Sequence, residues 1–138
     1  MSWKRCCDYA AAPFDRRGRR GKTRTDKRRG GWNVSVIMTL WMQGDPAGVE
    51  RYAAENPEKM RGIVDHAAEH GVIAHRFYGS DGQILVIDEW PDEESFNSFF
   101  AHMQGEIGPI MEAAGVTSEP KAVFWRKLET NDEYGWGA

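Results

Sequence analysis

A histidine and an aspartate have the residue types and spacing for acid/base chemistry. His75 and Asp88 lie in two short apolar segments that have the composition of β-strands. Between these segments, Asp81-Gly82 favours a tight hairpin turn. A two-residue turn puts His75 directly opposite Asp88, and a neighbouring carboxylate fixes the tautomer of an imidazole. We therefore expect either a general base or proton shuttle, or a structural hydrogen bond between two buried polar groups.

Alternation along the same two strands predicts the surroundings of this pair. Residues an even number apart share one face of a sheet, so Phe77, Val86 and Trp90 lie on the same face as the pair. These side chains would partly desolvate the two polar groups. We expect them to form the wall of a pocket for a small hydrophobic or aromatic ligand.

Other candidate residues give weaker signals. His66 and His70 are four residues apart on an expected helix and could reach one metal ion, but they flank or oppose its apolar stripe. No cysteine or carboxylate completes a site, so we expect two solvated histidines, no metal and no cofactor. Arg126, in the last expected strand, either holds an anionic group of the ligand or is exposed on the surface.

An α+β arrangement must position these residues. Residues 47–55 could form a short helix, but Asn56-Pro57 gives a better start signal, because Asn caps helices and Pro fits the first turn. Gly105 and Gly108-Pro109 predict a kink in a second helix. The expected elements are a strand at 34–42, a helix at 57–71, strands at 72–78 and 83–90, a helix from Pro91-Asp92 to before Gly115, and a strand at 121–128.

The order β-α-β-β-α-β is typical of a ferredoxin-like layer, in which two helices cover one face of a four-stranded antiparallel sheet. The other face must contact water, a ligand or another subunit. Both faces of the first strand are apolar, since Met38 and Leu40 alternate with Ile37 and Trp41. Isolated monomers rarely expose such a surface, so we expect a homodimer.

Charge divides the chain into two parts. Residues 1–33 contain 11 Lys or Arg and three acids, whereas residues 34–138 contain seven Lys or Arg and 18 acids, a balance of −11. The basic part lacks apolar periodicity and predicts a disordered tail. This tail is a nucleic-acid-binding arm, an inert tail or a spurious extension. The third interpretation arises because the patterned sequence begins at Val34 and a valine codon can start bacterial translation. The expected domain spans 34–128, followed by a C-terminal tail at 129–138.

The stretch ILVIDEWPDEESFNSFF, a strand that ends in an acidic residue and Trp before a helix with phenylalanines, resembles the dimeric α/β-barrel superfamily. It is most similar to the antibiotic-biosynthesis-monooxygenase group. The resemblance implies that Phe96 lines the pocket beside Trp90. Cofactor-free oxygenases of the group carry a polar amide where this chain has Val86. Haem-degrading members carry an iron-ligating histidine near the position of Pro109, so the resemblance disfavours haem degradation.

Three functions follow from these observations. The first is a small-molecule enzyme of the monooxygenase-like type, possessing a cofactor-independent monooxygenase or isomerase activity. The second is a non-catalytic protein that binds or senses a small molecule. The third is RNA binding through residues 1–33, although the acidic domain would repel phosphate. No apolar run reaches the ~20 residues of a membrane span. The only cysteines, Cys6 and Cys7, are adjacent and cannot form a disulfide bond between distant segments, so we expect a cytoplasmic protein.

Overall fold

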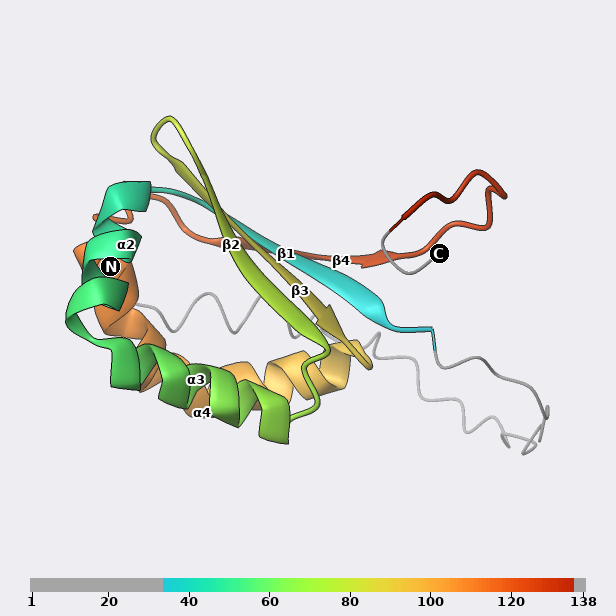
Figure 1. Ribbon diagram of the computed structural model, residues 1–138, viewed down its shortest axis with the longest axis horizontal. Helices are drawn as coiled ribbons and strands as arrows, with labels where there is room; N and C mark the ends of the chain where they lie inside the picture. Colours follow the sequence, from blue (N-terminus) through green and yellow to red (C-terminus); the bar gives the residue numbers. More distant parts are fainter. Residues whose placement is uncertain (1–33, 136–138) are drawn as a thin grey trace, which may run out of the picture.

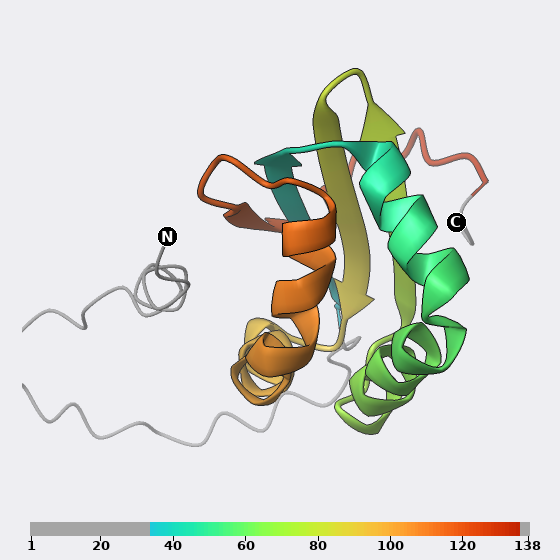
Figure 2. The same cartoon turned by 90° about the vertical axis from the view of Figure 1, so that its left-hand side faces the viewer.

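The computed structural model describes residues 34–135, which form a four-stranded antiparallel sheet and three helices. The helices lie together on one side of the sheet (Figure 1 and Figure 2). The strand order β2-β3-β1-β4 is that of the expected ferredoxin-like fold. The elements are β1 Val36–Gln43, α2 Pro46–Glu55, α3 Pro57–Glu69, β2 Ala74–Ser80, β3 Gln83–Trp90, α4 Glu93–Ala113 and β4 Lys121–Arg126.

The first crossover contains two helices, where the sequence predicts one. Asp45 accepts a hydrogen bond from the backbone N–H of Ala47 at 3.0 Å, and Pro46 occupies the first turn, so α2 has both start signals. Asn56 ends α2, and its side chain donates to the carbonyl of Tyr52 instead of capping α3. The expected helix start at Asn56-Pro57 is confirmed, but Asn56 occupies the N-cap position without a side-chain hydrogen bond to α3, because its amide bonds backward to the preceding helix.

The third helix, α4, is continuous from Glu93 to Ala113 with Pro109 inside it, and Figure 2 shows that its axis bends, as the kink prediction implies. Asp92 caps its start by accepting hydrogen bonds from the backbone N–H and the hydroxyl of Ser95, both at 2.8 Å. The Ser95 backbone N–H, followed by its hydroxyl, holds the pKa of the Asp92 carboxyl below its ordinary value. A strong cap thus fixes the point at which the chain leaves β3.

The strand bounds differ slightly from the sequence expectation. β1 begins at Val36 rather than Val34, β2 begins at Ala74, and β4 ends at Arg126. The hairpin pairs Ser80 with Gln83, so its turn has two residues, and Gly82 adopts a φ of 66°. Such a turn favours glycine at a left-handed position. The two-residue turn is what sets the pairing of β2 with β3.

The core lies between the inner face of the sheet and the helices. The inner face contributes the fully buried Met38, Met42, Ile84 and Trp90, and α4 contributes a stripe of phenylalanines. α2 packs closely on the end of α4, because a Cβ on Gly48 would lie 2.3 Å from the carbonyl oxygen of Ala113. This contact fixes one end of the helical layer.

The predictions for the basic tail at 1–33 and for the last three residues lie outside the described part of the chain. Within residues 34–135, no helix is long and apolar enough to cross a membrane.

Candidate functional site

His75 and Asp88 are opposite each other on the inner face of the sheet. The register of β2 and β3 pairs them directly, and His75 Nδ1 lies 2.6 Å from Asp88 Oδ1. Asp88 is only 4% exposed, whereas the His75 side chain is 30% exposed. An ionised carboxylate only accepts hydrogen bonds, so beside an ionised Asp88 the donor is His75 Nδ1–H, and in the neutral imidazole the lone pair is then on Nε2. The imidazole is therefore held in one tautomer by a buried partner.

The second oxygen of Asp88 is also occupied. Trp90 Nε1 donates a hydrogen bond to Asp88 Oδ2 at 3.1 Å, from a side chain that is 0% exposed. Trp90 is two residues from Asp88 on the same strand and packs against Phe96 and Phe99 of α4. In the described part of the chain, no buried side-chain nitrogen or oxygen lacks a hydrogen-bond partner. The two donors thus fix the plane of the carboxylate.

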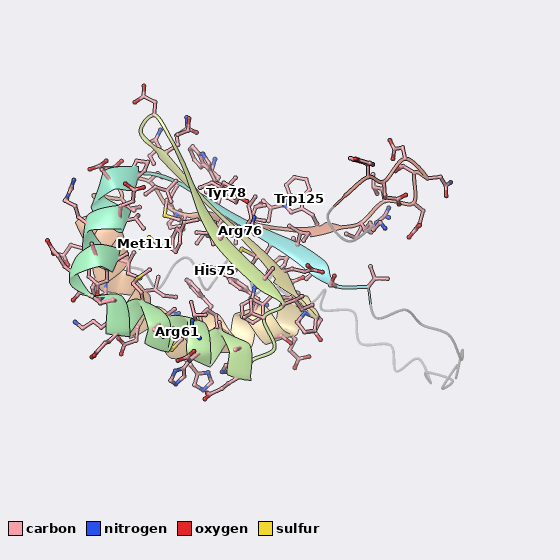
Figure 3. The ribbon with its side chains drawn as sticks, in the orientation of Figure 1. Arg61, His75, Arg76, Tyr78, Met111 and Trp125 are labelled. Carbon is pink, nitrogen blue, oxygen red and sulfur yellow. The ribbon has the colours of Figure 1, made fainter. Side chains whose placement is uncertain are left out.

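These residues border a cavity of about 70 Å³ between the sheet and helices α3 and α4. Figure 3 shows His75 on the helix side of the sheet, with Tyr78 and Trp125 on the opposite side. His75 and Asp88 are the polar members of a lining that is otherwise hydrophobic. The lining residues are Met38, Leu40, Met60, Ile63, Val64, Ala67, His75, Phe77, Val86, Asp88, Phe96, Phe99, Phe100, Ile107, Ile110 and Met111.

Most expected pocket residues come together here. Phe77, Val86 and Phe96 line the cavity beside the polar pair. Trp90 does not line it, because its indole lies behind Asp88 in the core. Arg126 does not line it either: it pairs with Val36 at the end of the sheet and is exposed. Of the two alternatives expected for Arg126, the structure therefore shows the exposed surface residue.

Sequence reasoning missed the wall that α3 supplies. Met60, Ile63 and Val64 follow the spacing of an apolar helical stripe, and such a stripe indicates burial without saying which side chains border a cavity. Met111, on the opposite wall, comes from the last turns of α4. Methionine side chains are flexible and fill irregular spaces, so these walls can adjust more easily than the sheet.

The remaining histidines lie away from this cavity. His66 is exposed and its Nδ1 lies 3.2 Å from the carbonyl oxygen of Gly62, as expected for a solvated residue. His70 and His102 have neighbouring rings on α3 and α4. Within residues 34–135, no group of three or more His, Cys, Asp or Glu side chains could hold a metal ion.

The fold is similar to those of several solved structures. A monooxygenase from Streptomyces coelicolor, in complex with nanaomycin D, is 16% identical with a TM-score of 0.55, over 74% of this chain and 95% of that one. A dimeric ferredoxin-like protein from an uncultured marine organism is 13% identical with a TM-score of 0.53, over 73% and 94%. An antibiotic biosynthesis monooxygenase is 14% identical with a TM-score of 0.50, over 67% and 98%.

No family model matches the sequence, and no curated protein does. The likeness to solved structures therefore identifies the architecture. The described domain has the ferredoxin-like fold of the antibiotic biosynthesis monooxygenases and of dimeric ferredoxin-like proteins, as the resemblance of residues 84–100 implies.

Proposed function

We propose that the protein is a small-molecule enzyme of the monooxygenase-like type, which binds a hydrophobic or aromatic substrate in the cavity beside His75. The observation that carries this proposal is the hydrogen bond between the partly exposed His75 and the buried Asp88, in a lining that is otherwise apolar. Clefts of this kind, with a few convergent polar groups, are typical of small-molecule sites. The similar fold of a monooxygenase in complex with nanaomycin D supports the reaction class.

His75 would act as the general base. Its Nε2 carries the lone pair, since Nδ1–H donates to Asp88. Removing the proton of a phenol or enol gives an electron-rich anion, and Asp88 would stabilise the imidazolium that forms. With O₂ as co-substrate, oxidation of a methylene between two aromatic rings to a carbonyl uses one oxygen atom for the product and one for water. The substrate then supplies all four electrons, and no other reductant is required.

The volume of the cavity limits the size of a substrate that fits without movement of the lining side chains. Its volume of about 70 Å³ is smaller than the ~150 Å³ engineered cavity in another protein that binds benzene. An aromatic ring would therefore require rearrangement of the lining. Met60 and Met111 are the side chains best suited to rearrange, because unbranched thioethers change rotamer at low cost.

We also propose that the chain acts as a homodimer through the outer face of the sheet. Tyr78, Val123 and Trp125 on this face are 40%, 41% and 53% exposed, and no helix covers it in the described chain. Trp125 donates to Thr39 at 2.8 Å, so part of this apolar surface is held rigid. A rigid, largely apolar face is suited to self-association.

Turnover of a panel of phenols in which a methylene lies between two aromatic rings tests the enzyme proposal. We expect O₂ consumption with a product 14 mass units heavier, as conversion of CH₂ to C=O requires. His75→Ala should lower kcat by about 10²-fold or more, the range of general-base catalysis. Asp88→Asn should lower it as well, because an amide can present its N–H to the imidazole and favour the other tautomer.

His66→Ala is the matched control, since this exposed histidine lies outside the cavity. Full activity of His75→Ala would overturn the assignment. A ligand that binds in the cavity without turnover, and whose affinity falls in the His75 variant, would instead support the second function, a protein that binds or senses a small molecule.

A further inference from the structure

We propose that His70 and His102 form a binding site for one divalent transition-metal ion, which ties α3 to α4. His70 follows the last residue of α3, and His102 lies within α4. The centroids of their imidazole rings are 5.5 Å apart, with the planes tilted by 41°. Neither residue lines the cavity. Two strong metal ligands from distant segments therefore meet at a place that the proposed function does not use.

The separation of the two rings fits a shared metal ion. A Zn–N distance of about 2.1 Å places each ring centroid roughly 3.2 Å from the ion, and two such rings at a tetrahedral angle lie about 5 Å apart. The observed 5.5 Å differs from this by an amount that a small side-chain rotation supplies.

The hydrogen bonds leave suitable lone pairs. His102 Nδ1 lies 2.7 Å from the carbonyl oxygen of Ser98, and because a carbonyl only accepts, Nδ1 carries the hydrogen. Its Nε2 is then an unprotonated ligand atom, oriented by a backbone carbonyl as in many metal sites. The half-buried His70 packs edge-on against Phe99, and its ring nitrogens make no hydrogen bond to any residue from 34 to 135.

Solvent would complete the coordination shell. No third protein ligand is in range within the described chain, so the site has two imidazoles and an open side toward water. Imidazole suits Zn²⁺, Ni²⁺ and Cu²⁺, and the balance of −11 over residues 34–138 attracts cations. The ion would join the two helices that border the cavity, and would restrain their separation.

A competing arrangement uses α3 alone. His66 and His70 are four residues apart on this helix, a spacing that can also chelate a metal ion. The ring of His102 already lies beside that of His70, with 5.5 Å between the centroids, and this proximity favours the pair of His70 and His102. The two arrangements differ in one residue and can be separated by substitution.

Isothermal titration of tag-free full-length protein with NiCl₂ and with ZnCl₂ tests the proposal, after the two cysteines have been alkylated so that they cannot bind the ion. We expect one ion per chain and a rise in Tm of about 4 °C or more at saturation. His70→Ala and His102→Ala should each lose affinity at least tenfold, and His66→Ala should bind as the wild type does.

Unchanged binding in His102→Ala, or loss of binding in His66→Ala, would overturn the proposal in favour of a site on α3 alone or elsewhere. His102→Gln and His70→Gln serve as second variants, and melting curves without metal show that each is folded. Absence of binding to the wild-type protein would also overturn it, and turnover in the cavity would be unaffected by that result.

Discussion

At the residue scale, Asp88 is the group on which the candidate site depends. It is buried, and its two oxygens bind a half-exposed imidazole and a fully buried indole. An unpaired buried carboxylate oxygen would be costly, so the two hydrogen bonds stabilise the fold and orient His75 at the same time. Removing the hydrogen-bond partner of either Asp88 oxygen should therefore lower both the free energy of unfolding and kcat.

Trp90→Phe tests both effects, one on the free energy of unfolding and one on kcat. Phenylalanine keeps an aromatic ring in the core but removes the donor to Asp88 Oδ2, so the free energy of unfolding should fall by about 1–3 kcal/mol. Because Trp90 does not line the cavity, kcat should fall while KM changes little. Urea unfolding and steady-state kinetics measure the two quantities.

Trp125→Phe is the control for this variant, since it removes an indole hydrogen bond to Thr39 on the outer face. If both variants lost the same stability and the same kcat, Trp90 would have no positioning role.

At the element scale, the caps explain which sequence expectations hold. The hairpin turn is local, so Asp81-Gly82 sets the register and places His75 opposite Asp88 from sequence alone. Asp45-Pro46 is ambiguous, because the same residues that end a strand can also cap a helix, so the sequence favoured the later start at Asn56-Pro57 over the short helix at 47–55. The cavity depends on how α3 and α4 pack over the sheet, which no local pattern encodes.

The cap of α4 predicts a pH effect. The pKa of Asp92 is lowered in the folded state by the backbone N–H and then the hydroxyl of Ser95. Its contribution to stability is therefore complete above the ordinary carboxyl pKa, about 4, and is lost as the pH falls through the lower folded value. Asp92→Asn keeps a good capping residue that does not titrate.

Urea unfolding of the wild type and of Asp92→Asn from pH 6 to pH 2.5 measures this effect. The stability advantage of the wild type should shrink as the pH is lowered. A difference that stays constant over this range would show that the cap does not titrate.

At the scale of the whole molecule, the outer face of the sheet predicts self-association. Val123→Asp places a charge within the apolar surface and should shift a dimer to monomer at micromolar concentration. Analytical ultracentrifugation measures the oligomeric state of the wild type and of the variant. Ile73→Asp is the control, because Ile73 is 56% exposed but precedes β2 away from this face. A wild-type monomer would contradict the homodimer.

The indole behind Asp88 also gives the protein an internal spectroscopic reporter. Trp90 touches the carboxylate and two phenylalanines of α4 but is shielded from solvent. In protein labelled with 5-fluorotryptophan, its ¹⁹F resonance should be insensitive to the water isotope, unlike that of the exposed Trp125. A change in the cavity that moves Asp88 would shift this one signal, so occupancy of the cavity can be followed before any reaction is identified.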